Sequence, residues 1–254
     1  MMLLLAACSQ SEAPPALVEP PPEPPAPEPE AAPAADEPAA PATPVAELMR
    51  GHFARATMAR MALIRADMPA AKEAMAWLAT HELGGALPAE LKPRLGEMQT
   101  AAAAFKDAAN LREAGVAFAT TLSKCGSCHA AAGKGPTIAA EPMPDTPGLT
   151  GHMQRHHWAT RRMWSGLVTA SDEAFGHGVD ALDEAPLDAA ALSAVGDQVD
   201  KVGALDAHVH NLAKKMKAAE TQPEKIEAYG HMLATCAVCH RLMGRGPAPV
   251  GPTE

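Results

Sequence analysis

Aromatic residues are scarce in this chain of 254 residues, since one Tyr, three Trp and four Phe make up only 3% of it. A core with so few rings is short of bulky side chains, and a large apolar group could fill it. Basic residues are also few, because 21 Lys and Arg stand against 30 Asp and Glu and leave a net charge of −9. Phosphate binding needs a basic face, so we expect no nucleic-acid partner. Past the first few residues, no stretch approaches the roughly 20 apolar residues of a membrane span.

Proline is abundant near the N-terminus. Residues 13–44 contain thirteen prolines, interleaved with Ala and Glu. Such a segment cannot bury enough apolar surface to fold, and its like charges repel one another. Residues 9–44 are therefore predicted to be a disordered, semi-rigid linker, with a reach of about 3.1 Å per residue.

The first eight residues, MMLLLAAC, resemble a bacterial lipoprotein signal whose lipobox ends at Cys8. The resemblance implies cleavage before Cys8 and a lipid on its thiol, which would anchor the chain at the periplasmic face of a bacterial membrane. Ser9 and Gln10 follow the cysteine without an Asp, which by the same resemblance favours the outer membrane. An ordinary secretory signal is the alternative. Both interpretations send the chain out of the cytoplasm, and the first makes the linker a tether.

After residue 44 the chain is predicted to be helical, and its pattern occurs twice. Around two cysteine motifs the positions match at an offset of 111: Phe118, Leu122, Cys125, Cys128, His129, Gly133, Gly135 and Pro136 pair with Tyr229, Leu233, Cys236, Cys239, His240, Gly244, Gly246 and Pro247. Nearer the start of each half the offset is 104: Met49, His52, Leu63, Ile64, Ala66 and Leu78 pair with Met153, His156, Leu167, Val168, Ala170 and Leu182. A repeat of this length indicates a duplicated domain.

Start and stop signals divide each copy into four helices. N-caps are expected at Asp67, Asn110, Ser171 and Thr221, and left-handed C-caps at Gly133 and Gly244. The helices of the second copy are predicted at about 148–168, 172–184, 188–219 and 223–242. Short connections make neighbouring helices antiparallel. The predicted fold is all-α, with two tandem up-down four-helix bundles over 45–136 and 148–247 and a tail over 248–254.

The repeated motif is CxxCH, formed by Cys125, Cys128 and His129 and again by Cys236, Cys239 and His240. A redox dithiol would need a βαβ context, and no strand pattern is present. A zinc ribbon would need cysteine pairs 15 to 20 residues apart, not over a hundred. The remaining chemistry is c-type haem attachment, in which both thiols form thioethers and the His ligates iron. The motifs therefore predict two covalently bound haem c groups, and with Cys8 they account for all five cysteines.

A CxxCH at the end of the fourth helix of a bundle resembles the cytochrome c-prime and c-556 class. The resemblance covers residues 45–136 and 148–247 and depends on motif position and helix pattern. In that class the sixth iron position, at the start of the first helix, is either apolar or a Met ligand. Here Met49-x-x-His52 recurs as Met153-x-x-His156. The recurring histidines predict bis-His iron.

Two alternatives for the sixth ligand stay open. Met49 and Met153 recur as well as the histidines do. A shift of one residue would align His157, rather than His156, with His52. Five other histidines have no counterpart in the repeat and are expected to be structural: His81, His177, His208, His210 and His231.

The expected activity is electron transfer between redox partner proteins by a membrane-tethered dihaem cytochrome, not an enzyme, because bis-His iron has no open position. One alternative is binding or sensing of small gas ligands at five-coordinate haem, as the resemblance allows. Another is a dihaem peroxidase. A peroxidase needs one vacant iron and a nearby acid–base residue, and no acidic side chain recurs beside the candidate distal positions.

Overall fold

The computed structural model describes residues 44–83, 87–139, 141–244 and 246. Within these ranges it is all-α, as predicted, and contains no strand. Its helices are α1 (Pro44–Ile64), α2 (Met68–Thr80), α3 (Lys92–Ala104), α4 (Leu111–Ala132), α5 (Gly148–Thr169), α6 (Asp172–Ala181), α7 (Ala189–Ser193), α8 (Val199–Ala218) and α9 (Gln222–Met243). None of the described helices combines the length and hydropathy that a membrane crossing requires.

The predicted caps hold the helix ends in place. The Asp67 carboxylate accepts from the Ala70 N–H at 3.1 Å at the start of α2, and Asn110 and Ser171 cap α4 and α6 in the same way. At α9 Thr221 and Glu224 form the reciprocal capping box. Each bond satisfies an N–H that has no partner within its helix. The N-cap predictions are therefore confirmed.

One predicted helix is wrong. The segment 188–219 is not continuous, because α7 ends at Ser193 and α8 begins only at Val199. Between them Gly196 has a φ of +63°, a left-handed conformation that breaks a helix and suits glycine. The preceding helix also stops earlier than expected, since α6 ends at Ala181 and not at 184.

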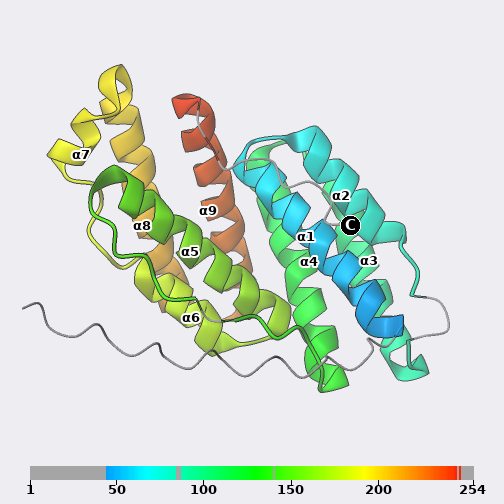
Figure 1. Ribbon diagram of the computed structural model, residues 1–254. Coiled ribbons are helices and arrows are strands. Elements are labelled where there is room, and N and C mark those ends of the chain that lie inside the picture. Colours follow the sequence, from blue (N-terminus) through cyan, green and yellow to red (C-terminus); the bar gives the residue numbers. More distant parts are fainter. Residues whose placement is uncertain (1–43, 84–86, 140, 245, 247–254) are drawn as a thin grey trace, which may run out of the picture. The chain divides into compact units, whose positions relative to one another are not determined.

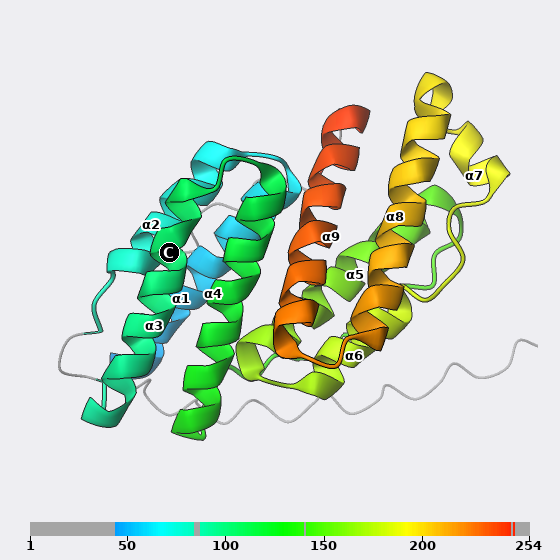
Figure 2. The same cartoon turned by 180° about the vertical axis from the view of Figure 1, so that it is seen from behind.

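Successive helices pack against one another within each half. In the first half α1 packs on α2, α2 on α3 and α3 on α4; in the second, α5 packs on α6, α6 on α8 and α8 on α9. Figures 1 and 2 show α4 and α9 side by side and running in opposite directions at the junction of the halves. There α5 also packs on α4, and α1 on α9. Most of the buried apolar side chains of both halves form one continuous core.

Glycine allows the close approach of α4 and α9. A Cβ added to Gly115 would lie 2.2 Å from the Gly230 carbonyl oxygen, and one added to Gly230 would lie 2.5 Å from the Val116 nitrogen. Both neighbours are backbone atoms, which cannot turn aside as a side chain can. The two helices that carry the CxxCH motifs are therefore in direct backbone contact.

Candidate functional site

The two CxxCH motifs lie in the last turns of α4 and α9. Gly133 and Gly244 end these helices with φ of +60° and +59°, so the predicted left-handed caps are confirmed. Because α4 and α9 are antiparallel, the motifs lie toward opposite ends of the pair (Figure 1). Among the described residues, the cysteines of the two motifs do not gather into one group of potential metal ligands. The arrangement argues against a shared four-cysteine zinc site.

The first cysteine of each motif is a poor thiolate. Desolvation by burial, with a smaller effect of the neighbouring cysteine, raises the pKa of the Cys125 thiol to about 12. Burial and the neighbouring Cys239 have the same effect on Cys236. A redox-active dithiol needs the opposite shift, toward a pKa of about 7 or below. The structure therefore disfavours dithiol exchange at both motifs.

The histidine of each motif is held by the other half of the chain. His129 Nδ1 donates to the Val168 carbonyl oxygen at the end of α5, at 2.7 Å, and His240 Nδ1 donates to the Ile64 carbonyl oxygen at the end of α1, at 3.1 Å. Such a bond fixes the imidazole with its proton on Nδ1 and its lone pair on Nε2. This is the tautomer that a metal-ligating histidine needs.

These bonds also establish the register of the repeat. Ile64 and Val168 accept equivalent bonds, and the left-handed residues just beyond them, Ala66 and Ala170, have φ of +59° and +52°. Both pairs are 104 residues apart. Since α1 and α5 are continuous helices back to their first turns, the same offset makes His156 the structural counterpart of His52. The shift that would align His157 with His52 is thereby excluded.

His52 and His156 have the same unusual environment. Each is 8% exposed, and each has a buried Nε2 with no hydrogen-bond partner. Burial is the main cause that lowers the pKa of His52 to about 4, helped by His81 and by His129 of the CxxCH motif. Burial, with His152 next, lowers the pKa of His156 to about 3. Both imidazoles are therefore neutral at pH 7, and no hydrogen bond occupies the Nε2 of either ring.

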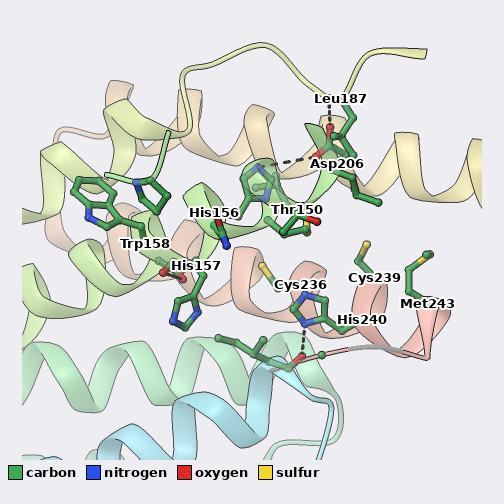
Figure 3. Close-up of a pocket in the computed structure, with 18 of the residues that line it drawn as sticks. Thr150, His156, His157, Trp158, Leu187, Asp206, Cys236, Cys239, His240 and Met243 are labelled. Atoms are coloured by element: carbon green, nitrogen blue, oxygen red, sulfur yellow. Dashed lines mark hydrogen bonds and ion pairs between the residues drawn. The ribbon is translucent and has the colours of Figure 1, made fainter. Parts of the chain in front are cut away.

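A cavity of about 720 Å³ lies beside the second motif. Figure 3 shows Cys236, Cys239 and His240 of α9 facing it, with His156 of α5 on its wall. Cavities of 300–1,000 Å³ are typical of small-molecule and cofactor sites. Apolar side chains lie beside the first motif: Leu83, Leu87 and Leu91 form a buried cluster against which Leu48, Met49, Leu95, Cys128 and Ala132 pack.

The alternative ligands lie near the same places. Met153 and His157 line the cavity, and Met49 packs against the leucine cluster beside Cys128. His157 is exposed and both methionines are partly buried, unlike the buried His52 and His156. The methionines recur at equivalent positions, but of these candidates only His52 and His156 have a fully buried Nε2 without a hydrogen-bond partner.

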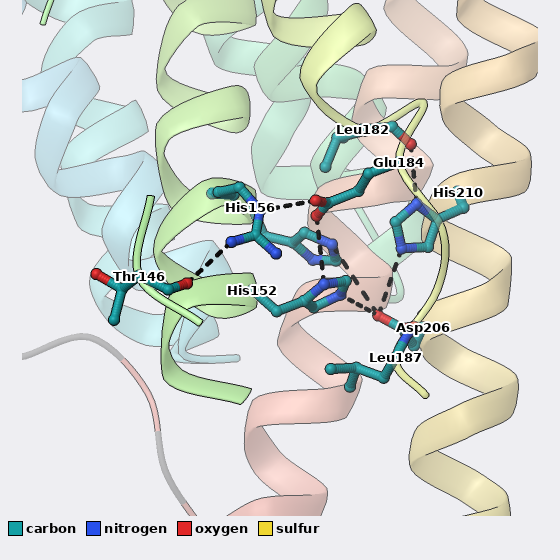
Figure 4. Close-up of polar contacts among 9 residues, drawn as sticks. Thr146, His152, His156, Leu182, Glu184, Leu187, Asp206 and His210 are labelled. Atoms are coloured by element: carbon teal, nitrogen blue, oxygen red, sulfur yellow. Dashed lines mark hydrogen bonds and ion pairs between the residues drawn. The ribbon is translucent and has the colours of Figure 1, made fainter. Parts of the chain in front are cut away.

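The structure adds a cluster that the sequence interpretation missed. His152, His156, Asp206 and His210 are all buried, and their potential ligand atoms lie within 4.8 Å of one another (Figure 4). The sequence pattern predicts a structural role for His210, and it predicts no functional role for His152 or Asp206. The available signal was their spacing, because His152–His156 and Asp206–His210 are both i,i+4 pairs that lie on one face of a helix.

Hydrogen bonds hold this cluster in place. His152 Nε2 donates to Asp206 Oδ1 at 2.8 Å, and the Leu187 N–H donates to Asp206 Oδ2 at 2.8 Å. Burial alone would raise the pKa of Asp206, but the hydrogen bonds from His152 and the Leu187 N–H, with the His210 imidazole 3.7 Å away, reverse this and hold it well below its usual value. The carboxylate is therefore charged, and its Oδ1 faces the imidazoles of His152 and His210.

Comparisons with known proteins give no relative: no protein-family model matches the chain, and no curated protein or solved structure matches it. Cys8, residues 9–43 of the predicted linker and the whole predicted tail over 248–254 lie outside the described residues, and Pro44, the last residue of the predicted linker, is instead the first residue of α1.

Proposed function

We propose that the chain is a dihaem c-type cytochrome that carries electrons between redox partner proteins. The observation that carries the proposal is a geometry that occurs twice. In each half a CxxCH motif ends a helix, its histidine is held at Nδ1 by a carbonyl, and a buried histidine with a free Nε2 lies on the first helix of the same half. No dithiol or zinc site explains all three features.

The described residues fit the proposed group. Cys125 and Cys128 would hold the first haem through thioethers, and Cys236 and Cys239 the second. His129 and His240 would be the proximal ligands, since their bonds to Val168 and Ile64 leave Nε2 for iron. The cavity beside Cys236 has room for a large apolar group, and the leucine cluster gives Cys128 an apolar environment. Such a group would also supply the bulk that this aromatic-poor core lacks.

His52 and His156 would be the sixth ligands. A buried imidazole nitrogen without a partner is costly, and coordination to iron would remove that cost. When bound, a haem ligated by two histidines would supply outer-sphere transfer of one electron. Burial keeps the imidazoles of His52 and His156 neutral and away from water. The carbonyls of Val168 and Ile64 fix the rings of the CxxCH histidines across the junction of the halves.

Each half would be a four-helix bundle of the cytochrome c-prime and c-556 kind, formed by α1–α4 and by α5, α6, α8 and α9. The packing of successive helices supports this assignment. The two halves would then form a pair within one chain, joined along α4 and α9. With a lipid on Cys8 and a proline-rich linker, the pair would be tethered at the periplasmic face of a bacterial membrane, and the resemblance of the residues after Cys8 to a lipoprotein sorting signal favours the outer membrane.

Covalent attachment tests the proposal. The full chain, produced in a host that attaches haem c, is expected to keep two haems after denaturation, measured by intact mass and by haem staining on a denaturing gel. Replacing Cys125 and Cys128 together by Ala should remove one haem, and the matched pair Cys236 and Cys239 the other. A chain that emerges from this host with four alkylatable thiols in the two motifs would refute the proposal.

A further inference from the structure

Three residues of the buried cluster, His152, Asp206 and His210, have no metal-binding counterpart in the first half. His152 is 104 residues after Leu48, and the 111 offset pairs Asp206 with Leu95 and His210 with Gln99. The structure supports this pairing, because Gln99 Nε2 donates to the His81 carbonyl oxygen just beyond α2, and His210 Nδ1 donates to the Leu182 carbonyl oxygen just beyond α6. The second half thus has two imidazoles and a carboxylate where the first has two leucines and an amide.

His156 differs from these three because its counterpart in the first half, His52, is also a histidine, and both have a buried Nε2 without a hydrogen-bond partner. A feature common to both halves belongs to the function that both halves share. It also lies farthest from the carboxylate, since its Nε2 is 4.0 Å from Asp206 Oδ1, compared with 2.8 Å for His152 and 3.7 Å for His210. We therefore leave His156 to the proposed haem.

We infer that His152, Asp206 and His210 bind a divalent metal ion of the zinc class, separate from the two proposed haem irons. Two imidazoles and one carboxylate are ligands that zinc accepts, with water in the fourth position. Tetrahedral zinc with bonds of 2.0–2.2 Å places its ligand atoms about 3.3–3.5 Å apart. The distances of 2.8 and 3.7 Å from Asp206 Oδ1 to the two Nε2 atoms require only small adjustments.

The groups behind these ligands also suit a metal. His210 Nδ1 donates to the Leu182 carbonyl oxygen at 2.8 Å, which leaves its Nε2 as the ligand atom, and that buried Nε2 has no hydrogen-bond partner. His152 Nδ1 lies 3.2 Å from Glu184 Oε1, so a proton displaced from His152 Nε2 by the metal has an acceptor on the other side of the ring. Carboxylates and carbonyls in these positions orient metal-ligating histidines and increase their basicity.

The site is also shielded from solvent and contains carboxylates that can balance the charge of a cation. The side chains of His152, Asp206 and His210 are only 2–4% exposed, so bulk water competes little for the ion. The Asp206 carboxylate, whose Oδ2 accepts from the Leu187 N–H at 2.8 Å, and the Glu184 carboxylate, whose Oε1 lies 3.2 Å from His152 Nδ1, would partly balance the charge of the ion. The positive charge of Arg155 is paired with Glu184, whose Oε2 lies 2.7 Å from Arg155 Nε.

Zinc retention by the full holoprotein tests the inference. After incubation with Zn²⁺ and gel filtration, the wild type is expected to retain one zinc per chain, measured by elemental analysis beside its iron. Asp206→Asn keeps the shape of the side chain but removes the charge, and should weaken zinc binding at least about 100-fold, since even residues behind the ligands contribute 10–100-fold. His177→Gln, which removes an exposed imidazole on α6, is the matched control and should bind as the wild type does.

Two further variants keep the test decisive. The triple change His152→Leu, Asp206→Leu and His210→Gln gives the second half the residues of the first half, so it should fold and bind no zinc. His156→Ala should retain the zinc, because His156 is not a ligand of this site. The inference is overturned if the wild type releases its zinc, if Asp206→Asn retains it equally well, or if His156→Ala loses it as Asp206→Asn does. Haem content is measured separately on denatured protein, so failure of the haem proposal would be recognised independently.

Discussion

The contact between α4 and α9 gives a prediction whose size follows from the structure. In Gly115→Ala the new methyl group would lie 2.2 Å from the Gly230 carbonyl oxygen, whereas ordinary contacts begin at 3.4 Å. The two helices must therefore move apart by about 1 Å, in the region where α4 and α9 join the halves. Overpacking of this kind costs about 1–3 kcal/mol, and more where only backbone atoms can yield.

The same substitution has an opposing effect, because alanine favours a helix over glycine by about 1 kcal/mol. Because the clash is with backbone atoms on both sides, its cost is expected at the upper end, about 3 kcal/mol, which leaves a net loss of unfolding free energy of about 2 kcal/mol. Gly96→Ala in α3 is the matched control, because a Cβ there meets nothing within 4 Å. It should gain about 0.5–1 kcal/mol.

Urea unfolding of both variants, followed by far-UV circular dichroism, measures these changes. The midpoint should fall for Gly115→Ala and rise slightly for Gly96→Ala. A Gly115→Ala protein as stable as the wild type would show that α4 and α9 are not in backbone contact, and would refute the arrangement of the halves described above.

Three further results are expected of the holoprotein. His52→Ala and His156→Ala should each make one haem high-spin and leave the other unchanged, by electron paramagnetic resonance; two low-spin haems in both variants would show that the ligand assignment is wrong. The low-spin spectrum of the wild type should persist on acidification to about pH 4, because an imidazole must be neutral to bind iron and the pKa values of His52 and His156 are lowered to about 4 and 3. Loss of the low-spin spectrum near pH 6.5 would indicate exposed ligands. Zinc loading should raise the midpoint potential of one haem, because a nearby cation disfavours ferric iron, whereas equal shifts of both would contradict a site in the second half.

Much of the fold could be predicted from the sequence because its signals are local. The N-caps at Asp67, Asn110, Ser171 and Thr221 depend on side chains within three residues of the bonds they make. The break at Gly196 was missed, since a lone glycine inside an otherwise helical pattern is tolerated more often than it breaks the helix.

The candidate site was only partly predictable for the same reason. Repetition pointed to His52 and His156, because equal spacing from each motif is visible in one dimension. The bonds from His129 to Val168 and from His240 to Ile64 join different halves, and nothing local in the sequence encodes them. The cluster around Asp206 joins α5 to α8 and occurs in one half alone. A comparison of the two copies of the repeat therefore could not predict it.

The spin state of the two irons decides whether the proposed haems are six-coordinate, as an electron carrier with two histidine ligands requires. The ferric holoprotein at pH 7 is expected to give two low-spin signals by electron paramagnetic resonance, with no methionine charge-transfer band in its optical spectrum. The optical spectra of the oxidised protein with nitric oxide and of the reduced protein with carbon monoxide should equal those of the untreated protein, since His52 and His156 would fill the sixth positions. A high-spin spectrum that changes when these gases are added would contradict the account and favour a gas-binding protein instead.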